Sequence, residues 1–178
     1  MHPPTHLMIS WLIGSRLPER RDRRLVAWAG VAPDLDGLTV LAGIESYGRW
    51  HHLLTHGLVT ALVVTALWAS LARDRLKVVG LALLTFHLHL VCDLLGSGVQ
   101  WPITYFWPFS SYQFFTPYGW ELDSWQNWVV AVLALLACGR IGVVYGRTFG
   151  ETFLPAKLDA LVAETLRRRF GFPEPRHP

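Results

Sequence analysis

Two apolar segments constrain this chain most, because each approaches the ~20 residues that a helix needs to cross a hydrocarbon core. They occupy residues 76–95 and Trp125–Tyr145. A third segment, 57–72, reaches spanning length if its helix begins near Trp50. The chain is 52% hydrophobic and only 16% charged, whereas a typical soluble domain carries roughly 25% charged residues. The sequence therefore predicts an all-α, membrane-embedded helical bundle with about three full spans.

The remaining apolar segments are shorter. Residues 5–17 and 25–32 fall below ~17 residues, a length typical of half-spans and interfacial helices. Near the C-terminus, Pro155 begins a segment with one apolar face and three arginines near its end, which predicts a surface helix. We therefore expect one membrane-embedded domain over residues 1–150. A cytoplasmic amphipathic helix and a disordered tail follow over residues 151–178.

Histidines and aspartates gather in three short clusters within or beside the apolar segments. Burying such groups is costly unless something pairs with them. Imidazole and carboxylate are also the ligands that bind borderline or hard divalent metals at neutral pH. The clusters therefore predict a metal site. Its candidate ligands are His6, Asp34, Asp36, His51, His52, His56, His89 and Asp93.

Spacing indicates which of these side chains share a face. His89 and Asp93 are four residues apart on a predicted helix, so they project from the same side one turn apart. His52 and His56 have the same spacing and form the natural helical pair. His51 and His56 would diverge by ~140° on an ideal helix, although His51 could still turn inward at a helix entry.

Two aspartates follow directly after Pro33. If the chain is extended there, Asp34 and Asp36 point to the same side, although ordinary turn and capping chemistry is the alternative for such a pair. His87 lies about 200° from His89 around the predicted helix. We therefore interpret His87 as a packing or helix–helix hydrogen-bonding residue.

Basic residues show a complementary pattern. All but Arg49 of the sixteen Lys and Arg residues fall in four blocks, at 16–24, 73–77, 140–147 and 157–176. Following the hairpins along the chain places every block on one side and every candidate ligand on the other. Because positively charged loops favour the cytoplasm, we expect a multi-pass membrane protein with its site toward the outer face. The lipid bilayer is then its partner, and nucleic acid is not.

The connection over residues 96–124 lies on the ligand side and is rich in aromatic residues. An aromatic belt at the level of the lipid headgroups is one interpretation. A lid that covers the metal site and contacts a lipid-like substrate is the other. Glu121 and Asp123 are on the same side and could act as the catalytic base or complete the metal site.

The order and spacing of four motifs over residues 5–110 resemble the YdjM-like inner-membrane metal-dependent hydrolases. The motifs are Thr5-His6-Leu7, Pro33-Asp34-Leu35-Asp36, His51-His52-Leu53-Leu54-Thr55-His56-Gly57-Leu58, and His89 to Asp93 with Gly98-Val99 and Trp107-Pro108. The resemblance implies metal ligands at His6, Asp34, Asp36, His51, His56, His89 and Asp93. Because this family is likened to zinc-dependent phospholipases, the resemblance also implies hydrolysis of a phosphoester.

The chain departs from the family pattern at two positions. His52 stands where the family usually has an arginine, and Gly57 stands where it usually has a serine. That arginine would be a natural phosphate clamp. Helical geometry favours His52 as the ligand, whereas the resemblance favours His51. We assign His51 as the ligand and His52 as a general acid/base or alternate ligand.

The resulting hypothesis is a metal-dependent hydrolase that cleaves a lipid-derived phosphoester with a metal-activated water. Seven ligands exceed the three or four protein ligands of one zinc ion, so we expect two or three divalent ions, zinc or alternatively manganese. The competing hypotheses are a metal-stabilised membrane protein without catalysis and a metal transporter. A transporter would need polar residues spread through several spans, whereas here they concentrate at one face.

Overall fold

The computed structural model describes residues 1–99 and 101–171, and every regular element within them is helical. The elements are α1 (Pro3–Gly14), α2 (Arg20–Ala29), the 3-10 helix η1 (Ala32–Ala42), α3 (Ile44–Trp50), α4 (Leu58–Leu71), α5 (Arg75–Gly96), α6 (Trp125–Tyr145), the 3-10 helix η2 (Phe149–Thr152) and α7 (Ala156–Arg169). The predicted all-α class is therefore confirmed. The proposed division at residue 150 falls inside η2 and stays a prediction.

Local sequence explains where several helices begin and end. Pro3 starts α1, where the missing amide hydrogen of proline costs nothing. The Asp74 carboxylate caps α5 by accepting the amide hydrogen of Lys77. Helix α6 ends at Gly146, whose φ of 66° is the left-handed conformation that glycine adopts readily.

Within the described residues, the two helices α5 and α6 are long and apolar enough to cross a membrane. A third span is present if α2 and η1, which meet at an angle of 56°, form one broken span. The expected third span at residues 57–72 is wrong as a full span, because α4 contains only 14 residues. Residues 51–57 form turns and cannot extend α4 back to Trp50.

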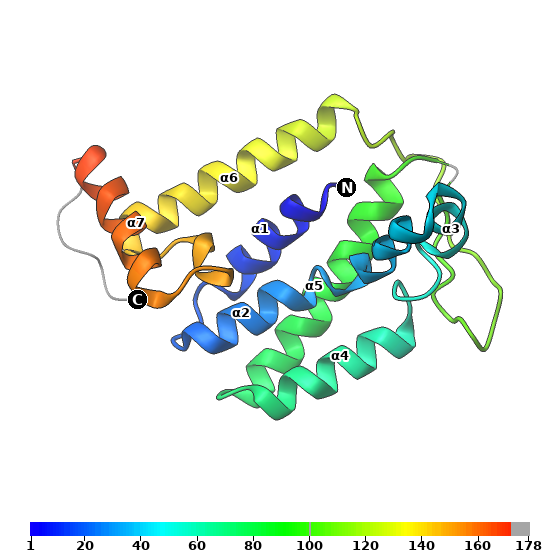
Figure 1. Cartoon of the computed structure of the whole chain (residues 1–178), viewed down its shortest axis with the longest axis horizontal. Helices are drawn as coiled ribbons and strands as arrows, with labels where there is room; N and C mark the ends of the chain where they lie inside the picture. The colour runs from blue at the N-terminus through cyan, green and yellow to red at the C-terminus, as the bar shows by residue number, and fades with distance from the viewer. Residues whose placement is uncertain (100, 172–178) are drawn as a thin grey trace.

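Helices α2 and α4 both pack against α5, and α1 packs between α2 and α6 (Figure 1). Three groups of buried side chains fill the interior. One, around Trp11, joins α1, α2 and α6; another, around Phe86, joins η1, α4 and α5. The third, around Val26, joins α2 to the start of α5. The core is therefore a series of small helix–helix interfaces, as expected for a bundle with few long helices.

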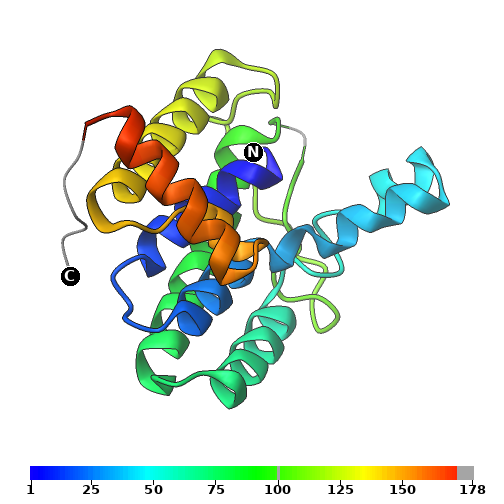
Figure 2. The same ribbon diagram turned by 60° about the vertical axis from the view of Figure 1, so that its left-hand side comes forward.

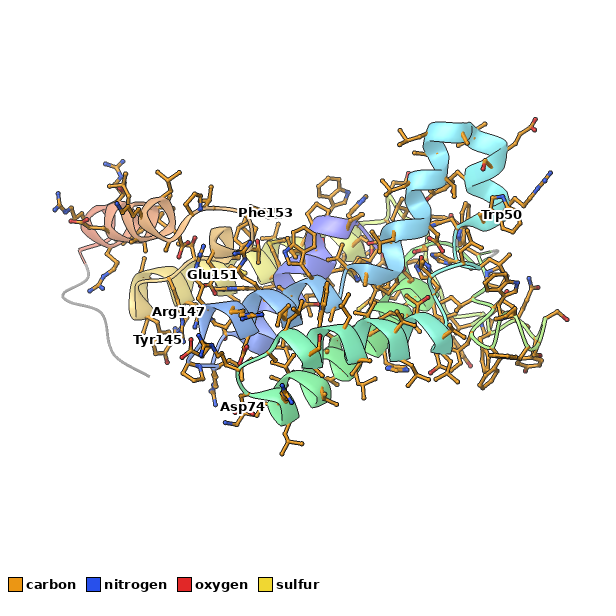
Figure 3. The ribbon with its side chains drawn as sticks, turned by 60° about the horizontal axis from the view of Figure 1, so that its bottom comes forward. Trp50, Asp74, Tyr145, Arg147, Glu151 and Phe153 are labelled. Atoms are coloured by element: carbon orange, nitrogen blue, oxygen red, sulfur yellow. The ribbon has the colours of Figure 1, made fainter. Side chains whose placement is uncertain are left out.

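The bundle has two chemically different ends. The α1–α2 turn, the α4–α5 turn and α7 lie at one end, which we call the basic end; η1, α3 and the 97–124 connection lie at the other (Figure 1). The Asp22 carboxylate joins the start of α2 to the α4–α5 turn by accepting the amide hydrogens of Arg73 and Asp74 at 2.8 Å each. Asp74 and Arg147 lie far from Trp50 in Figure 3. This arrangement agrees with the expected separation of basic blocks from ligands, while the orientation in the membrane stays a prediction.

Candidate metal centre

The seven predicted ligands lie in one cluster between α1, η1, the 51–57 turn and α5. Asp93 is its hub. Helix α5 carries His89 and Asp93 on one face, with 2.9 Å between His89 Nε2 and Asp93 Oδ2. Helix α1 contributes His6, whose Nε2 is 3.0 Å from Asp93 Oδ1. All three side chains are 2% exposed or less. The proximity expected from the i,i+4 spacing on α5 is therefore confirmed.

The 51–57 turn adds two more imidazoles around Asp93. His56 Nε2 lies 3.4 Å and His52 Nε2 lies 3.5 Å from Asp93 Oδ2. The prediction that these histidines form a helical pair is wrong, because α3 ends at Trp50 and the chain then turns. His52 has a φ of 66°, a left-handed conformation that is uncommon for residues other than glycine. This conformation places His52 beside Asp93 without helical spacing.

Hydrogen bonds fix which nitrogen each imidazole presents to the hub. His89 Nδ1 donates to the Gly30 carbonyl at 2.8 Å, and His52 Nδ1 donates to the Trp101 carbonyl at 3.3 Å. His56 Nδ1 donates to Asp36 Oδ2 at 3.0 Å. With Nδ1 protonated, a neutral imidazole has its lone pair on Nε2. Metal-binding histidines are typically held by such a bond from the distal nitrogen.

These bonds leave a conflict that a cation resolves. The Nε2 atoms of His56 and His89 are 3.3 Å apart, and both face the Asp93 carboxylate. Lone pairs and carboxylate oxygens repel one another unless a proton or a metal ion lies between them. Asp34 Oδ1 is 3.6 Å from His89 Nε2, and Asp34 Oδ2 is buried without a hydrogen-bond partner in the described part of the chain. The donor set therefore fits a divalent metal ion.

Asp36 is positioned differently from the other aspartates. Its Oδ1 accepts from His51 Nδ1 at 2.6 Å, and its Oδ2 accepts from His56 Nδ1 and from the Thr55 amide at 3.0 and 3.1 Å. The expectation of an extended chain after Pro33 is wrong, because η1 is a 3-10 helix. Asp34 consequently faces His89 while Asp36 faces the 51–57 turn.

Two overlapping groups have ligand atoms close enough to share a metal ion. Among the described residues, the ligand atoms of each group lie within 4.8 Å of one another. One group, called here the Asp93 group, consists of Asp34, His56, His89 and Asp93; the other, the Asp36 group, consists of Asp36, His51 and His56. His56 belongs to both groups and can offer a different nitrogen to each. The structure thus contains groups that could hold one or two ions.

Burial and charge shift the pKa values of two turn histidines, His52 and His56, in opposite directions. Burial lowers the pKa of His52 to about 4, because the nearby Asp93 carboxylate only partly offsets it. Burial would also lower the pKa of His56, but the Asp36 and Asp93 carboxylates outweigh it and raise that pKa to about 9. His52 is therefore neutral at pH 7. His56 is therefore a protonated imidazolium at pH 7, and a metal ion bound to Nε2 would displace the proton on that atom.

A cavity of about 510 Å³ opens onto the cluster. Asp34, His51, His52 and Asp93 line it on the cluster side, and its other walls include Leu38, Tyr47, Trp101, Glu121 and Leu122. Glu121 therefore lines the cavity that opens onto the cluster, and its role there stays a prediction. Asp123 is exposed and is not among the described residues that line the cavity.

Part of the 97–124 connection covers the cluster. The Trp101 ring centroid lies 6.0 Å from that of the His51 ring and 5.9 Å from that of the His52 ring. His87 does not face the cluster; its Nε2 is 2.8 Å from the Tyr105 hydroxyl. The interpretation of His87 as a hydrogen-bonding residue is confirmed.

Sequence reasoning missed the roles of two residues around the cluster, Thr55 and Tyr47. Thr55 fixes Asp36 through its amide, and its hydroxyl donates to the Pro33 carbonyl. Tyr47 stacks on His51 at a ring distance of 4.5 Å. Tyr47 precedes His51 by four residues, so helical spacing could have identified it. Thr55 is adjacent to His56 in the sequence, which is a weaker indication of a role in the site.

Comparison with known proteins identifies the family. The family model described as YdjM inner membrane protein matches residues 1–156, and the chain belongs to this family. No curated protein and no solved structure matches the chain. The family description and the apolar helices together identify a membrane protein.

Proposed function

We propose that this member of the YdjM inner membrane protein family is a metal-dependent hydrolase that cleaves a lipid-derived phosphoester. The observation that carries the proposal is the convergence of the His56 and His89 Nε2 atoms on Asp93, each with its Nδ1 already hydrogen-bonded. Paired imidazole and carboxylate ligands beside a cavity are typical of hydrolytic metal sites.

In this proposal the Asp93 group holds the first ion, and His6 adds a further ligand from α1. His51 and Asp36 either hold a second ion with His56 or orient His56 from behind. The mixed nitrogen and oxygen donors suit zinc, and manganese is the alternative. When bound, such an ion supplies Lewis-acid stabilisation of phosphoryl oxygens and lowers the pKa of water.

His52 is the residue we assign to proton transfer. Its Nδ1 bond to Trp101 leaves Nε2 unprotonated, and its side chain lines the cavity. Burial lowers its pKa to about 4, so it is neutral at pH 7. Glu121 lines the same cavity and is the second candidate base. A catalytic role for the exposed Asp123 stays a prediction.

The surroundings of the cavity favour an amphiphilic substrate. The segment formed by η1 and α3 projects from the bundle beside the cavity (Figure 2). Its end is apolar, with Leu41 86% exposed and Ile44 74% exposed. Exposed apolar side chains of this kind insert into the interface between headgroups and acyl chains. A lipid held there would have its headgroup near the cluster.

Activity on a fluorogenic phospholipid in mixed micelles, with zinc or manganese added, tests the proposal. We expect His52→Gln to retain bound metal and thermal stability but to lose 10²–10⁴-fold in rate, the usual contribution of a general base. His87→Gln is the matched control, because His87 hydrogen-bonds Tyr105 away from the cluster. It should keep wild-type activity.

Loss of metal from His52→Gln but not from His51→Gln would show that His52 is the ligand and would overturn the assignment of roles. If the wild-type protein hydrolyses no lipid phosphoester with metal bound, the enzyme proposal is wrong. The cluster then serves to stabilise the protein or to transport metal.

A further inference from the structure

A second cavity lies away from the metal cluster, between α2 and α4. Its volume is about 620 Å³, within the ~300–1,000 Å³ of typical ligand pockets. Both helices pack against α5 (Figure 1), and the space between them forms a groove, which we call the α2–α4 groove. Apolar side chains from α2, η1 and α4 line most of it, among them Leu25, Trp28, Leu35, Val64 and Leu67.

One end of this groove is strongly basic. Arg20, Arg21 and Arg24 line it, and no acidic side chain does so among the described residues. Arg20 is partly engaged, because it donates to the Glu151 carbonyl at 3.0 Å. Arg21 is exposed and Arg24 is half-buried, and neither forms an ion pair within the part of the chain that the structure describes. Two guanidinium groups are thus free to bind an anion.

The groove also contains unused hydrogen-bonding capacity. Trp68 lines it, and the Trp68 indole nitrogen is buried with no acceptor among the described residues. The Arg20 Nε atom forms no hydrogen bond there but lies 3.8 Å from Glu151 Oε2, so Arg20 is already paired. A buried donor without an acceptor costs free energy, so a ligand with several oxygen atoms would fit this region better than a hydrocarbon alone.

The dimensions match one leaflet of a bilayer. Helix α2 has 10 residues and is therefore about 15 Å long. Half of a ~30 Å hydrocarbon core has the same thickness. A ligand with its anionic group at the arginines would extend an acyl chain of one leaflet along α2 toward Leu35. Basic pockets between membrane helices are known to bind anionic lipid headgroups.

We propose that the α2–α4 groove binds an anionic phospholipid, with the phosphate at Arg21 and Arg24 and an acyl chain along the apolar wall. Bidentate guanidinium–phosphate hydrogen bonds would select the headgroup. This lipid belongs to the leaflet at the basic end of the bundle, so it is not the substrate of the metal centre. Its binding does not depend on the proposed hydrolase activity.

Native mass spectrometry of the purified protein in mild detergent tests this proposal. The protein is mixed with equal amounts of phosphatidylglycerol and phosphatidylcholine of identical acyl chains. We expect the wild-type protein to retain one phosphatidylglycerol molecule at least tenfold more often than phosphatidylcholine, with or without a metal chelator. The double variant Arg21→Gln/Arg24→Gln should lose this preference while remaining folded, because neither arginine forms an ion pair in the described structure.

The matched control is Arg73→Gln/Arg75→Gln. It removes the same charge from exposed positions of the basic end that do not line the groove. This control should bind phosphatidylglycerol as the wild-type protein does. An equal loss in both double variants would mean that surface charge alone attracts the lipid, and equal retention of both lipids by the wild-type protein would overturn the proposal.

A second variant tests the apolar wall separately. Leu67 is 50% exposed and lines the groove, so Leu67→Trp should fill part of it without disturbing the core. We expect retained phosphatidylglycerol to fall at least fivefold, with unchanged helix content by circular dichroism. Undiminished retention would show that the lipid does not occupy the groove.

Discussion

Replacing Glu151 with glutamine should strongly destabilise the bundle, because this buried carboxylate joins three elements. Glu151 is 1% exposed and lies in η2. Its Oε1 accepts from the Trp11 indole at 2.7 Å and from Arg23 Nε at 2.6 Å. Its Oε2 accepts from a second nitrogen of Arg23 at 2.6 Å. Figure 3 shows Glu151 at the basic end beside Arg147.

The magnitude follows from what the substitution leaves behind. Arg23 is 5% exposed, so its guanidinium would remain buried beside a neutral amide. Removing one partner of a buried ion pair costs about 3–5 kcal/mol. For a chain of this size each kcal/mol lowers Tm by about 2–4 °C. We therefore expect Tm to fall by about 6–20 °C in Glu151→Gln.

Thermal unfolding in detergent, followed by circular dichroism, measures this shift. The matched control is Glu164→Gln, which removes an exposed i,i+4 ion pair with Arg168 on α7. Exposed pairs contribute about 0–1 kcal/mol, so the control should unfold close to the wild-type protein. Equal Tm values for Glu151→Gln and Glu164→Gln would refute the conclusion that the carboxylate of η2 holds the basic end together.

Two further predictions concern the two ends of the bundle. In a background lacking Cys92 and Cys138, cysteine at position 74 should be labelled only from the cytoplasmic side and cysteine at position 111 only from outside; the reverse pattern would overturn the orientation. Asn127→Ala should lower the free energy of unfolding by about 2–4 kcal/mol. The buried Asn127 side-chain amide donates hydrogen bonds to carbonyls of α5 and of the 97–124 connection. An unchanged free energy of unfolding, measured by chemical denaturation, would show that other contacts hold the connection.

Spacing predicts the part of the site that lies on a continuous helix. His89 and Asp93 both lie on α5, where a separation of four residues places them on one face whatever surrounds them. That geometry makes their 2.9 Å approach possible. The separation of basic blocks from the cluster is likewise predictable, because alternating apolar segments return the chain to each end in turn.

Spacing fails where tertiary contacts determine the backbone. His52 and His56 have helical spacing, yet the chain turns there and His52 takes a left-handed conformation. That turn is fixed by the Thr55 amide and by His56, both hydrogen-bonded to Asp36 from another element. No local sequence pattern predicts such contacts between distant elements. Glu151 was overlooked for the same reason, since its partners are 128 and 140 residues away in the chain.

Elemental analysis of the protein purified without chelator tests the metal centre most directly. We predict about two or more equivalents of divalent metal, zinc or manganese, in the wild-type protein. His89→Ala should lose most of that metal while remaining in the membrane, because the His89 Nε2 atom faces both Asp34 and Asp93. A wild-type protein free of metal after growth with added zinc and manganese, or full occupancy in His89→Ala, would contradict the metal centre.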